Sequence, residues 1–566
     1  MNKKNLVVII ILLAAALLRF WCLGRGDTVN DEVFYAFRAI GPLDFDHAEF
    51  QTTPLEWFDS RQNFAPQNLG GQAGIPFWTK LSFHDHPPLV FWVQHFFIKV
   101  FGENNFAFRL PSALFGIGSV YILYLLGSLL YSRAVGLVSG SLFALTLNHV
   151  YISRTGLQES YVIFFILLTA CLFLKALKND NYFLWAGASL GLAFLAKYTA
   201  FILVPIFFTY LLIFDRSKFF NKKLWIGLLL VILLFSPVII YNFKLYQTVG
   251  HFDFQFSYFF GQNPEAWQVA PGKEIGTLAE RIKNFIPRLI STNSPSLLLI
   301  FGFSLIGFCF NLFRDCQKRK ENYFILLSLF FLIILLLFVG PSFRFLTMLT
   351  PLIVLVATLG SVNLYQLSAK KMIWRSILLT LFLIWMFFEV FYSVNSQIAY
   401  YPRGNYPWLF SKIRYENYNW GYNELDSFLK KELAGKMPSR VFDMQYNFLE
   451  KIRDADLLKA RAAGLKSYPA LIVYYGNFDD GAKLWVLERL ATYHGWPVIE
   501  MEDYFGFLRK NGPEFFAKSG FREYYFITMN NIESSSEVRA LIKNLPYNGI
   551  FNQKGEEVFR VYRLQI

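Results

Sequence analysis

The chain contains a succession of apolar runs, each close to the length that crosses a lipid bilayer. A helix that rises about 1.5 Å per residue needs about 20 apolar residues to cross a hydrocarbon core about 30 Å thick. Because 55% of the 566 residues are hydrophobic, the apolar surface exceeds what a soluble fold buries. The sequence therefore predicts an α-helical polytopic membrane protein with about 11 spans, at residues 5–23, 109–131, 134–152, 159–177, 182–197, 198–214, 224–243, 296–313, 323–340, 345–367 and 374–394.

A twelfth run, residues 88–102, is ambiguous because it is short and contains His95 and Lys99. If it lies flat on the membrane surface, one side of the bilayer receives most of the lysine and arginine excess, and the positive-inside rule makes that side cytoplasmic. This excess accounts for most of the net charge of +14, so topology explains the charge without a nucleic acid partner. The loops concerned are residues 1–4, 132–133, 175–181, 215–223, 314–322 and 368–375.

The same orientation places the large loops outside the cell membrane. The first run follows "MNKK" but ends in "LLRFWCLG", which offers no small-residue cleavage site, so we expect an uncleaved anchor with a cytoplasmic N-terminus. We expect a transmembrane domain over residues 1–395, with outer loops at 24–108, which would carry interfacial helices, and at 244–295. Residues 396–566 alternate helix-like and strand-like stretches, which predicts an extracytoplasmic α/β domain.

Charged residues gather at the outer ends of the predicted helices. Insertion of a charge at the bilayer centre costs about 2.5–3.5 kcal/mol, so charges beside apolar runs need an explanation. Cations next to carboxylates suit an anionic, membrane-borne substrate such as a lipid phosphodiester, since lysine and arginine bind phosphate oxygens and a carboxylate accepts a proton from a hydroxyl. The residues that would line one outer cavity are Asp31, Glu32, His86, Arg154, Glu159, Lys197 and Arg344.

Each of these residues also has an ordinary structural interpretation. The three cations could extend to lipid headgroups, and the Asp31–Glu32 pair could form the first turn of a surface helix, where carboxylates favour the helix dipole. The "HDH" segment at 84–86 could ligate a metal, but a solvated turn before Pro87 is the simpler interpretation. The sequence has no glycine-rich phosphate loop, and its four cysteines lack the spacing of a metal or redox motif.

The order of these motifs resembles a known class of enzymes. "DE" after the first run, then "HDHPPLVFW", "SRTGLQESYVIFF" and "LAKYTAFILVP", with a weaker echo at "FRFLTMLTPL", resembles the GT-C class of polyprenyl-phosphate-sugar-dependent glycosyltransferases. The similarity is greatest to the branch with lipid A aminoarabinose transferases and protein O-mannosyltransferases, and it covers roughly residues 1–215.

The resemblance implies a role for each residue. Asp31 would be the catalytic carboxylate, as base or orienter of the acceptor hydroxyl, with Glu32 beside it and Glu159 at the second acidic position. Arg154, Lys197 and Arg344, with His86, would bind the donor phosphate. Two positions depart from the aminoarabinose branch: His86 stands for a lysine before the paired prolines, and Phe34 stands for an arginine. Arg38, on the same predicted helix, is the nearest cation that could replace that arginine.

The sequence therefore predicts a membrane glycosyltransferase with an outward-facing site. It would move a sugar from a polyprenyl-phosphate donor to an envelope lipid, glycan or protein acceptor, in the cell (plasma or inner) membrane. No cofactor is required, because the leaving group is a phosphate monoester, and a divalent metal is optional. The alternative is a transporter or flippase of polyprenyl-linked lipids, which would need ionisable residues near the midplane, discontinuous helices and a repeated half. A third interpretation is a scaffold whose membrane part is inert.

Overall fold

The chain divides into two compact units. The computed structural model describes residues 3–29, 31–48, 51–59, 74–267, 276–314, 318–368, 371–401, 403–406, 408–417, 419–530 and 535–566, so parts of the loops at 314–322 and 368–375 lie outside it. One unit, here the membrane unit, comprises Met1–Gly24 and Lys80–Glu416, and the other, the α/β unit, comprises Arg25–Thr79 and Asn417–Ile566. This division differs from the expected one, because residues 25–79 of the first loop pack with the C-terminal region.

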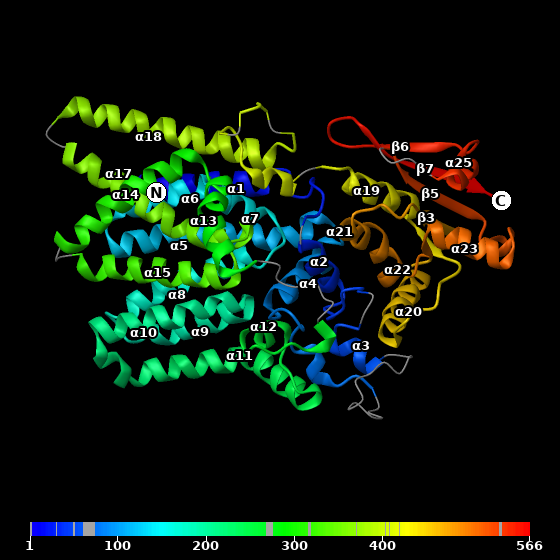
Figure 1. The fold of residues 1–566 in the computed structure, drawn as a ribbon, viewed down its shortest axis with the longest axis horizontal. Helices are drawn as coiled ribbons and strands as arrows, with labels where there is room; N and C mark the ends of the chain where they lie inside the picture. The colour runs from blue at the N-terminus through cyan, green and yellow to red at the C-terminus, as the bar shows by residue number, and fades with distance from the viewer. Residues whose placement is uncertain are drawn as a thin grey trace. The chain divides into compact units, whose positions relative to one another are not determined.

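The membrane unit is helical almost throughout (Figure 1). Its longer helices in chain order are α1 (Lys3–Phe20), α4 (Leu89–Phe101), α5 (Asn105–Leu130), α6 (Arg133–Leu145), α7 (Leu147–Arg154), α8 (Glu159–Ala176), α9 (Tyr182–Ala196), α10 (Leu203–Phe214), α11 (Lys222–Val249), α13 (Leu278–Thr292), α14 (Pro295–Arg314), α15 (Arg319–Val339), α17 (Thr350–Leu367) and α18 (Met372–Ser393). Shorter helical turns include η3 (Tyr198–Ile202), α12 (Phe254–Phe259), α16 (Phe343–Leu346) and η8 (Val394–Ile398).

Every predicted span is helical in the described residues. Six helices there are long and apolar enough to cross a membrane, and α6 with α7 makes a seventh if the bent pair is one span. The other four predicted spans form shorter apolar helices, at Asn5–Phe20, Tyr182–Ala196, Tyr198–Phe214 and Pro295–Phe310. The ambiguous run forms α4, whose 13 residues rise about 20 Å, less than the hydrocarbon thickness. The protein is thus a polytopic membrane protein.

The span expected at 134–152 is broken. Helices α6 and α7 meet at Thr146, whose extended backbone (φ −63°, ψ 127°) bends the pair by 58°. The Thr146 amide and hydroxyl both donate to the Leu142 carbonyl, at 2.8 and 2.7 Å, so this carbonyl keeps its backbone partner and gains a side-chain donor at the break. Neither proline nor glycine occupies the break.

Small residues let neighbouring helices approach closely. Helix α9 packs on α8 and α11, and α5 packs on α6 and α8. At the crossing of α9 and α11, a Cβ atom on Gly187 would lie 2.1 Å from the Gly227 carbonyl oxygen, so only glycine fits there. Two of the predicted site residues lie at the ends of these packed helices: Glu159 begins α8 and Lys197 follows α9.

The α/β unit contains a five-stranded mixed sheet with helices on both faces (Figure 1). The sequence predicts an α/β fold for its C-terminal region, without the strand order. The strand order is β4-β3-β5-β7-β6. Strands β4, β3 and β5 pair in parallel, and β7 pairs antiparallel with both of its neighbours, β5 and β6. The strands are β3 (Ala470–Tyr474), β4 (Val498–Glu500), β5 (Glu523–Met529), β6 (Tyr547–Phe551) and β7 (Glu557–Gln565), and a separate parallel pair joins β1 (Lys436–Pro438) to β2 (Lys466–Tyr468).

Alternate residues of β3 point to opposite cores. Ile472 packs with α19 (Tyr422–Leu433), η10 (Leu484–Glu488) and α22 (Arg489–His494), whereas Leu471 packs with α23 (Met501–Asn511) on the other face. The remaining helices of this unit are α2 (Glu32–Ile40), α3 (Pro54–Asp59), α20 (Asn447–Ala462), α21 (Asp480–Lys483), α24 (Phe515–Lys518) and α25 (Ser536–Ile542).

A third core joins the first-loop segment to the C-terminal region. Phe37 and Phe45 of the loop segment are buried with Tyr446, Phe448 and Tyr493. The rings of Phe37 and Tyr493 meet edge to face, with centroids 5.2 Å apart. This apolar contact explains why residues 25–79 belong to the α/β unit.

Candidate active site

Three of the predicted site residues converge in the membrane unit. Glu159 is fully buried at the first position of α8, and Lys197 follows the last residue of α9. The Lys197 Nζ atom lies 2.5 Å from Oε1 of Glu159, and Nε of Arg344 lies 3.8 Å from the same oxygen. Two cations therefore surround one carboxylate, which leaves an excess of positive charge at this point.

The aromatic ring of Phe345 supports this cluster. Lys197 Nζ lies 4.7 Å from the ring centroid and Arg344 Cζ lies 5.1 Å from it, both within range of cation–π attraction. Ser342 caps the short helix α16 by accepting a hydrogen bond from the Phe345 amide, which fixes Arg344 within that turn. The two cations are held near each other by Glu159 and Phe345 together.

The turn that carries Glu159 is fixed by neighbouring helices. Gln94 of α4 donates to the Gly156 carbonyl at 2.7 Å, and a Cβ atom on Gly156 would lie 2.7 Å from the Phe108 ring. The Oε2 atom of Glu159 is buried and accepts no hydrogen bond from any residue that the structure describes. A buried carboxylate oxygen of this kind is costly unless a bound molecule supplies a donor.

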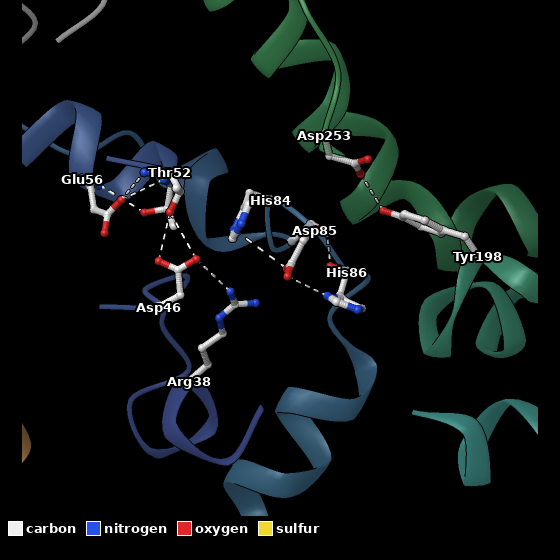
Figure 2. Close-up of polar contacts among 11 residues, drawn as sticks. Arg38, Asp46, Thr52, Glu56, His84, Asp85, His86, Tyr198 and Asp253 are labelled. Carbon is white, nitrogen blue, oxygen red and sulfur yellow. Dashed lines mark hydrogen bonds and ion pairs between the residues drawn. The ribbon is translucent and has the colours of Figure 1, made fainter. Parts of the chain in front are cut away.

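A second polar group adjoins Lys197 and was not foreseen from the sequence. The Tyr198 hydroxyl donates to Asp253 Oδ2 at 2.7 Å (Figure 2). The Asn242 side-chain amide donates to the same oxygen at 2.9 Å. Asp253 also caps α12 by accepting from the Phe256 amide. Burial raises the pKa of Asp253 to about 6, although these hydrogen bonds lower it. The only local signal for Asp253 in the sequence is the N-cap pattern of "DFQF", residues 253–256.

The "HDH" segment forms a partly buried turn rather than the solvated one expected. His84 is 5% exposed, and its carbonyl accepts from the Phe254 amide at 2.7 Å. Asp85 lies between the two imidazoles, with Oδ2 2.9 Å from His86 Nδ1 and Oδ1 3.9 Å from His84 Nδ1 (Figure 2). Asp85 thus lies within ion-pair distance of the His86 ring, and the predicted contact of His86 with donor phosphate stays a prediction.

Arg154 is committed in part to the end of α1. Its Nη1 donates to the carbonyls of Leu18, Arg19 and Trp21, at 3.0, 3.1 and 2.8 Å. These are among the terminal carbonyls that a helix leaves without internal partners. This contact accounts for one nitrogen of the guanidinium, and the predicted contact of Arg154 with donor phosphate stays a prediction.

Asp31 and Glu32 belong to the α/β unit, so the structure does not group them with the membrane cluster. Helix α2 begins at Glu32, as the surface-helix interpretation predicted, but the helix is buried rather than superficial. Glu32 is fully buried and accepts from the Val29 amide at 2.9 Å, whereas Asp31 is half-buried and its side chain does not cap the helix. Asp31 is thus the more accessible carboxylate of the pair.

Arg38 is paired within its own unit. It is 3% exposed, and its Nη2 lies 3.4 Å from Asp46 Oδ2, which also accepts from the Thr52 hydroxyl (Figure 2). Glu56 accepts from the amides of Thr52 and Thr53 and so fixes the start of α3. Arg38, the candidate replacement for the absent arginine, thus has a structural partner in Asp46.

Two buried ionisable residues within apolar helices, Arg19 and Glu389, were not predicted from the sequence. Arg19 is fully buried and donates to the carbonyls of Ala15 and Ala144 and to His149 Nδ1. Glu389 of α18 accepts from the hydroxyl of Ser296 and the indole of Trp385. Charges in such positions are costly when unpaired, so their networks of partners are consistent with a role in helix packing.

Sequence comparison relates one segment of the chain to known glycosyltransferases. Residues 85–241 match the family described as dolichyl-phosphate-mannose-protein mannosyltransferase. The putative mannosyltransferase YycA of Bacillus subtilis (strain 168) is 35% identical over 153 residues, 26% of this chain and 22% of YycA. The undecaprenyl phosphate-alpha-4-amino-4-deoxy-L-arabinose arabinosyl transferase of Wigglesworthia glossinidia brevipalpis is 25% identical over 158 residues, 26% of this chain and 28% of that protein. The aligned part is thus about a quarter of each relative.

Structural comparison extends over the whole chain. The crystal structure of ArnT from Cupriavidus metallidurans bound to undecaprenyl phosphate aligns with 99% of this chain and 98% of that chain, with a TM-score of 0.51 and 12% sequence identity. At this identity the match concerns the fold, and it includes both the helical region and the C-terminal region. These findings confirm the resemblance seen in the sequence: the chain has the GT-C fold, and its residues 85–241 carry the sequence pattern of the dolichyl-phosphate-mannose-protein mannosyltransferase family.

Proposed function

We propose that this protein is a membrane glycosyltransferase that uses a polyprenyl-phosphate-linked sugar as donor. The observation that carries the proposal is the cluster of Lys197, Arg344 and Glu159 at the ends of apolar helices, in a fold shared with a protein whose structure holds undecaprenyl phosphate. Two cations against one carboxylate attract an anion, and the apolar helices suit its lipid tail.

The reaction would be a transfer of a sugar to a hydroxyl or amino group. The acceptor atom forms a bond to the anomeric carbon while the bond from that carbon to the phosphate oxygen breaks, and the acceptor proton passes to a carboxylate. We assign that carboxylate to Asp31, which is more accessible than Glu32. Lys197 and Arg344, with His86 and Arg154, would stabilise the departing polyprenyl phosphate, whose charge develops in the transition state.

Glu159 has a different expected role. Its Oε1 atom pairs with Lys197, so it orients the cation, and its buried Oε2 atom is placed to accept a hydrogen bond from a hydroxyl of donor or acceptor. No cofactor is needed for this scheme, and a divalent metal remains optional. The acceptor would be an envelope lipid, glycan or protein, and the site would face outward from the plasma or inner membrane, with the N-terminus in the cytoplasm.

The test is sugar transfer by purified protein in lipid, with a panel of radiolabelled polyprenyl-phosphate sugars, with and without EDTA. We expect turnover by the wild type, and loss of turnover with retained donor binding in Asp31→Asn. The same rate in Asp31→Asn would overturn the catalytic assignment. Loss on EDTA treatment, restored by added divalent metal, would make the metal part of the site.

A transporter or flippase of polyprenyl-linked lipids is the second candidate. The break between α6 and α7 favours it, because discontinuous helices are typical of transporters. The two functions are separated by following the lipid: movement of intact donor between leaflets, with no sugar released across the donor panel, would support the transporter.

A further inference from the structure

Helix α19 begins without a side-chain cap of its own. Its N-cap residue is Gly421, which has a positive φ of 98° and offers no side chain. Asp27 of the first-loop segment takes this role: Oδ2 accepts from the amides of Trp420 and Gly421 at 2.5 and 3.1 Å, and Oδ1 accepts from Asn423 at 2.8 Å. A carboxylate at a helix N-terminus satisfies free amides and interacts favourably with the helix dipole.

Asp27 is a buried carboxylate at the N-terminus of α19. It is 3% exposed, and it lies four residues before Asp31 in the sequence. Burial raises its pKa to about 6, against the lowering effect of the three amides, and Glu424 on α19 adds to the rise. At neutral pH the group is therefore a carboxylate with three hydrogen-bond donors.

The other side of Asp31 is held by α22. The Tyr493 hydroxyl donates to the Phe37 carbonyl of α2 at 2.7 Å, in a buried contact. Helix α22 is joined in turn to α19, because Arg489 Nη2 lies 2.5 Å from Asp426 Oδ1 and both side chains are buried. A continuous chain of contacts thus runs from Asp27 to α19, from α19 to α22, and from α22 to Phe37. Asp31 and Glu32 lie in the sequence between Asp27 and Phe37.

We propose that the C-terminal region of the α/β unit, Asn417–Ile566, positions the Asp31–Glu32 turn, with Asp27 and Tyr493 as the positioning residues. The catalytic part of this inference rests on the function proposed above for Asp31. The positioning part does not, because it concerns only how α2 is held. The C-terminal region, for which the sequence offered no role, would then be a component of the site rather than an appendage.

The chain supplies a matched control in Asp59. This first-loop carboxylate also caps a helix of the C-terminal region: α20 has no side-chain cap from Tyr446, and Asp59 accepts from the Phe448 amide at 2.5 Å and the Asn447 side chain at 3.3 Å. Asp59 lies 28 positions after Asp31 and contacts α20, whose Phe448 shares an apolar core with Phe37 of α2, so any effect of Asp59 on α2 passes through that packing. A general loss of stability would affect Asp27→Asn and Asp59→Asn alike, whereas positioning would single out Asp27.

The first measurement is hydrogen exchange of the full-length protein in lipid nanodiscs. An asparagine at position 27 has a single oxygen for three amide donors, so its NH₂ group replaces an acceptor and at least one amide loses its partner. We expect the amides of α2 to exchange about tenfold faster in Asp27→Asn and in Tyr493→Phe, as loss of a cap or a buried hydrogen bond implies, and to change much less in Asp59→Asn. Equal rates in wild type and Asp27→Asn, or an equal rise in Asp59→Asn, would overturn the proposal.

The second measurement is the split between kcat and KM. We expect kcat of Asp27→Asn and Tyr493→Phe to fall about tenfold, with KM for the donor within about twofold, since misplacement of a reacting group is costly. The double variant Asp27→Asn/Asp31→Asn should match Asp31→Asn alone. Faster exchange in α2 with unchanged kcat would overturn the positioning role. If Asp31→Asn is as active as wild type, the proposed function of Asp31 fails, while the exchange result still decides whether Asp27 holds α2.

Discussion

Lys197 and Glu159 form a buried ion pair, with 2.5 Å between Nζ and Oε1, at the point where α9 ends and α8 begins. The two residues are 38 positions apart in the chain, and their side chains are 8% and 0% exposed. Removal of one partner from a buried pair leaves an uncompensated charge, which costs about 3–5 kcal/mol, whereas replacement of both by apolar residues is often neutral. This asymmetry allows folding and ligand binding to be tested separately.

We expect Lys197→Gln to destabilise the protein and to weaken donor binding at least tenfold, because about 1.5–3 kcal/mol is typical of a hydrogen bond to a charged group. The double variant Lys197→Met/Glu159→Leu should recover the unfolding temperature but not donor affinity. Competition with undecaprenyl phosphate gives the affinity, and thermal unfolding in detergent gives the stability. The control is Lys218→Gln, which breaks a more exposed pair with Asp180 and should change neither quantity much.

Arg344 offers a test of how the phosphate is bound. Its side chain is 24% exposed, three times the figure for Lys197, so it is the more accessible cation of the cluster. A guanidinium binds phosphate through two parallel hydrogen bonds, which lysine cannot reproduce. We expect Arg344→Lys to lower donor affinity and Arg344→Gln to lower it further.

The control for Arg344 is Arg281→Gln. Arg281 donates to the carbonyls of Leu337 and Phe338 at the end of α15, so its loss should lower thermal stability and leave the donor affinity of the folded protein unchanged. Equal affinities for wild type and Arg344→Gln would remove Arg344 from the phosphate site.

The loop around Asp253 should lose local stability as the pH rises. Because the folded pKa of about 6 lies above the ordinary 3.8, the contribution of this carboxyl is fully present below pH 3.8 and is lost as the pH rises through 6. We expect protection of the amides of α12 to fall between about pH 4 and 6, by at most about tenfold per pH unit, and to level off above the folded pKa. Hydrogen exchange corrected for intrinsic rates measures this, and Asp253→Asn should flatten the profile. A profile of equal slope in the variant would assign the pH dependence to another group, such as His251.

The sequence predicts those features whose free-energy cost depends on a single short segment of the chain. Long apolar runs must be helical in a bilayer, and the predicted spans are helices for that reason. The cost of a charge beside hydrocarbon led to Glu159, Lys197 and Arg344, which the structure brings together. The same cost singles out Arg154 in the sequence. Its partner, the end of α1, is visible only in the fold.

Other features depend on contacts between distant residues. No proline or glycine lies at the break at Thr146, so the sequence does not predict it. Asp27 and Asp59 cap helices about 390 residues later, so no local pattern contains both partners. The division of the chain into units follows from these contacts and from the core around Phe37, and a boundary drawn from hydropathy alone placed the first loop with the membrane spans.

The contact of Arg154 with α1 leads to a final prediction. Its Nη1 serves three carbonyls near the end of that helix, so Arg154→Gln should lower the unfolding temperature, since each buried polar group left without a partner costs about 1–3 kcal/mol. We expect donor affinity to fall less than in Lys197→Gln, because one nitrogen of the guanidinium is already committed to the backbone. An unchanged unfolding temperature with a large loss of affinity would reverse this order and make phosphate binding the main task of Arg154. Thermal unfolding and undecaprenyl phosphate competition on the same preparations distinguish the two.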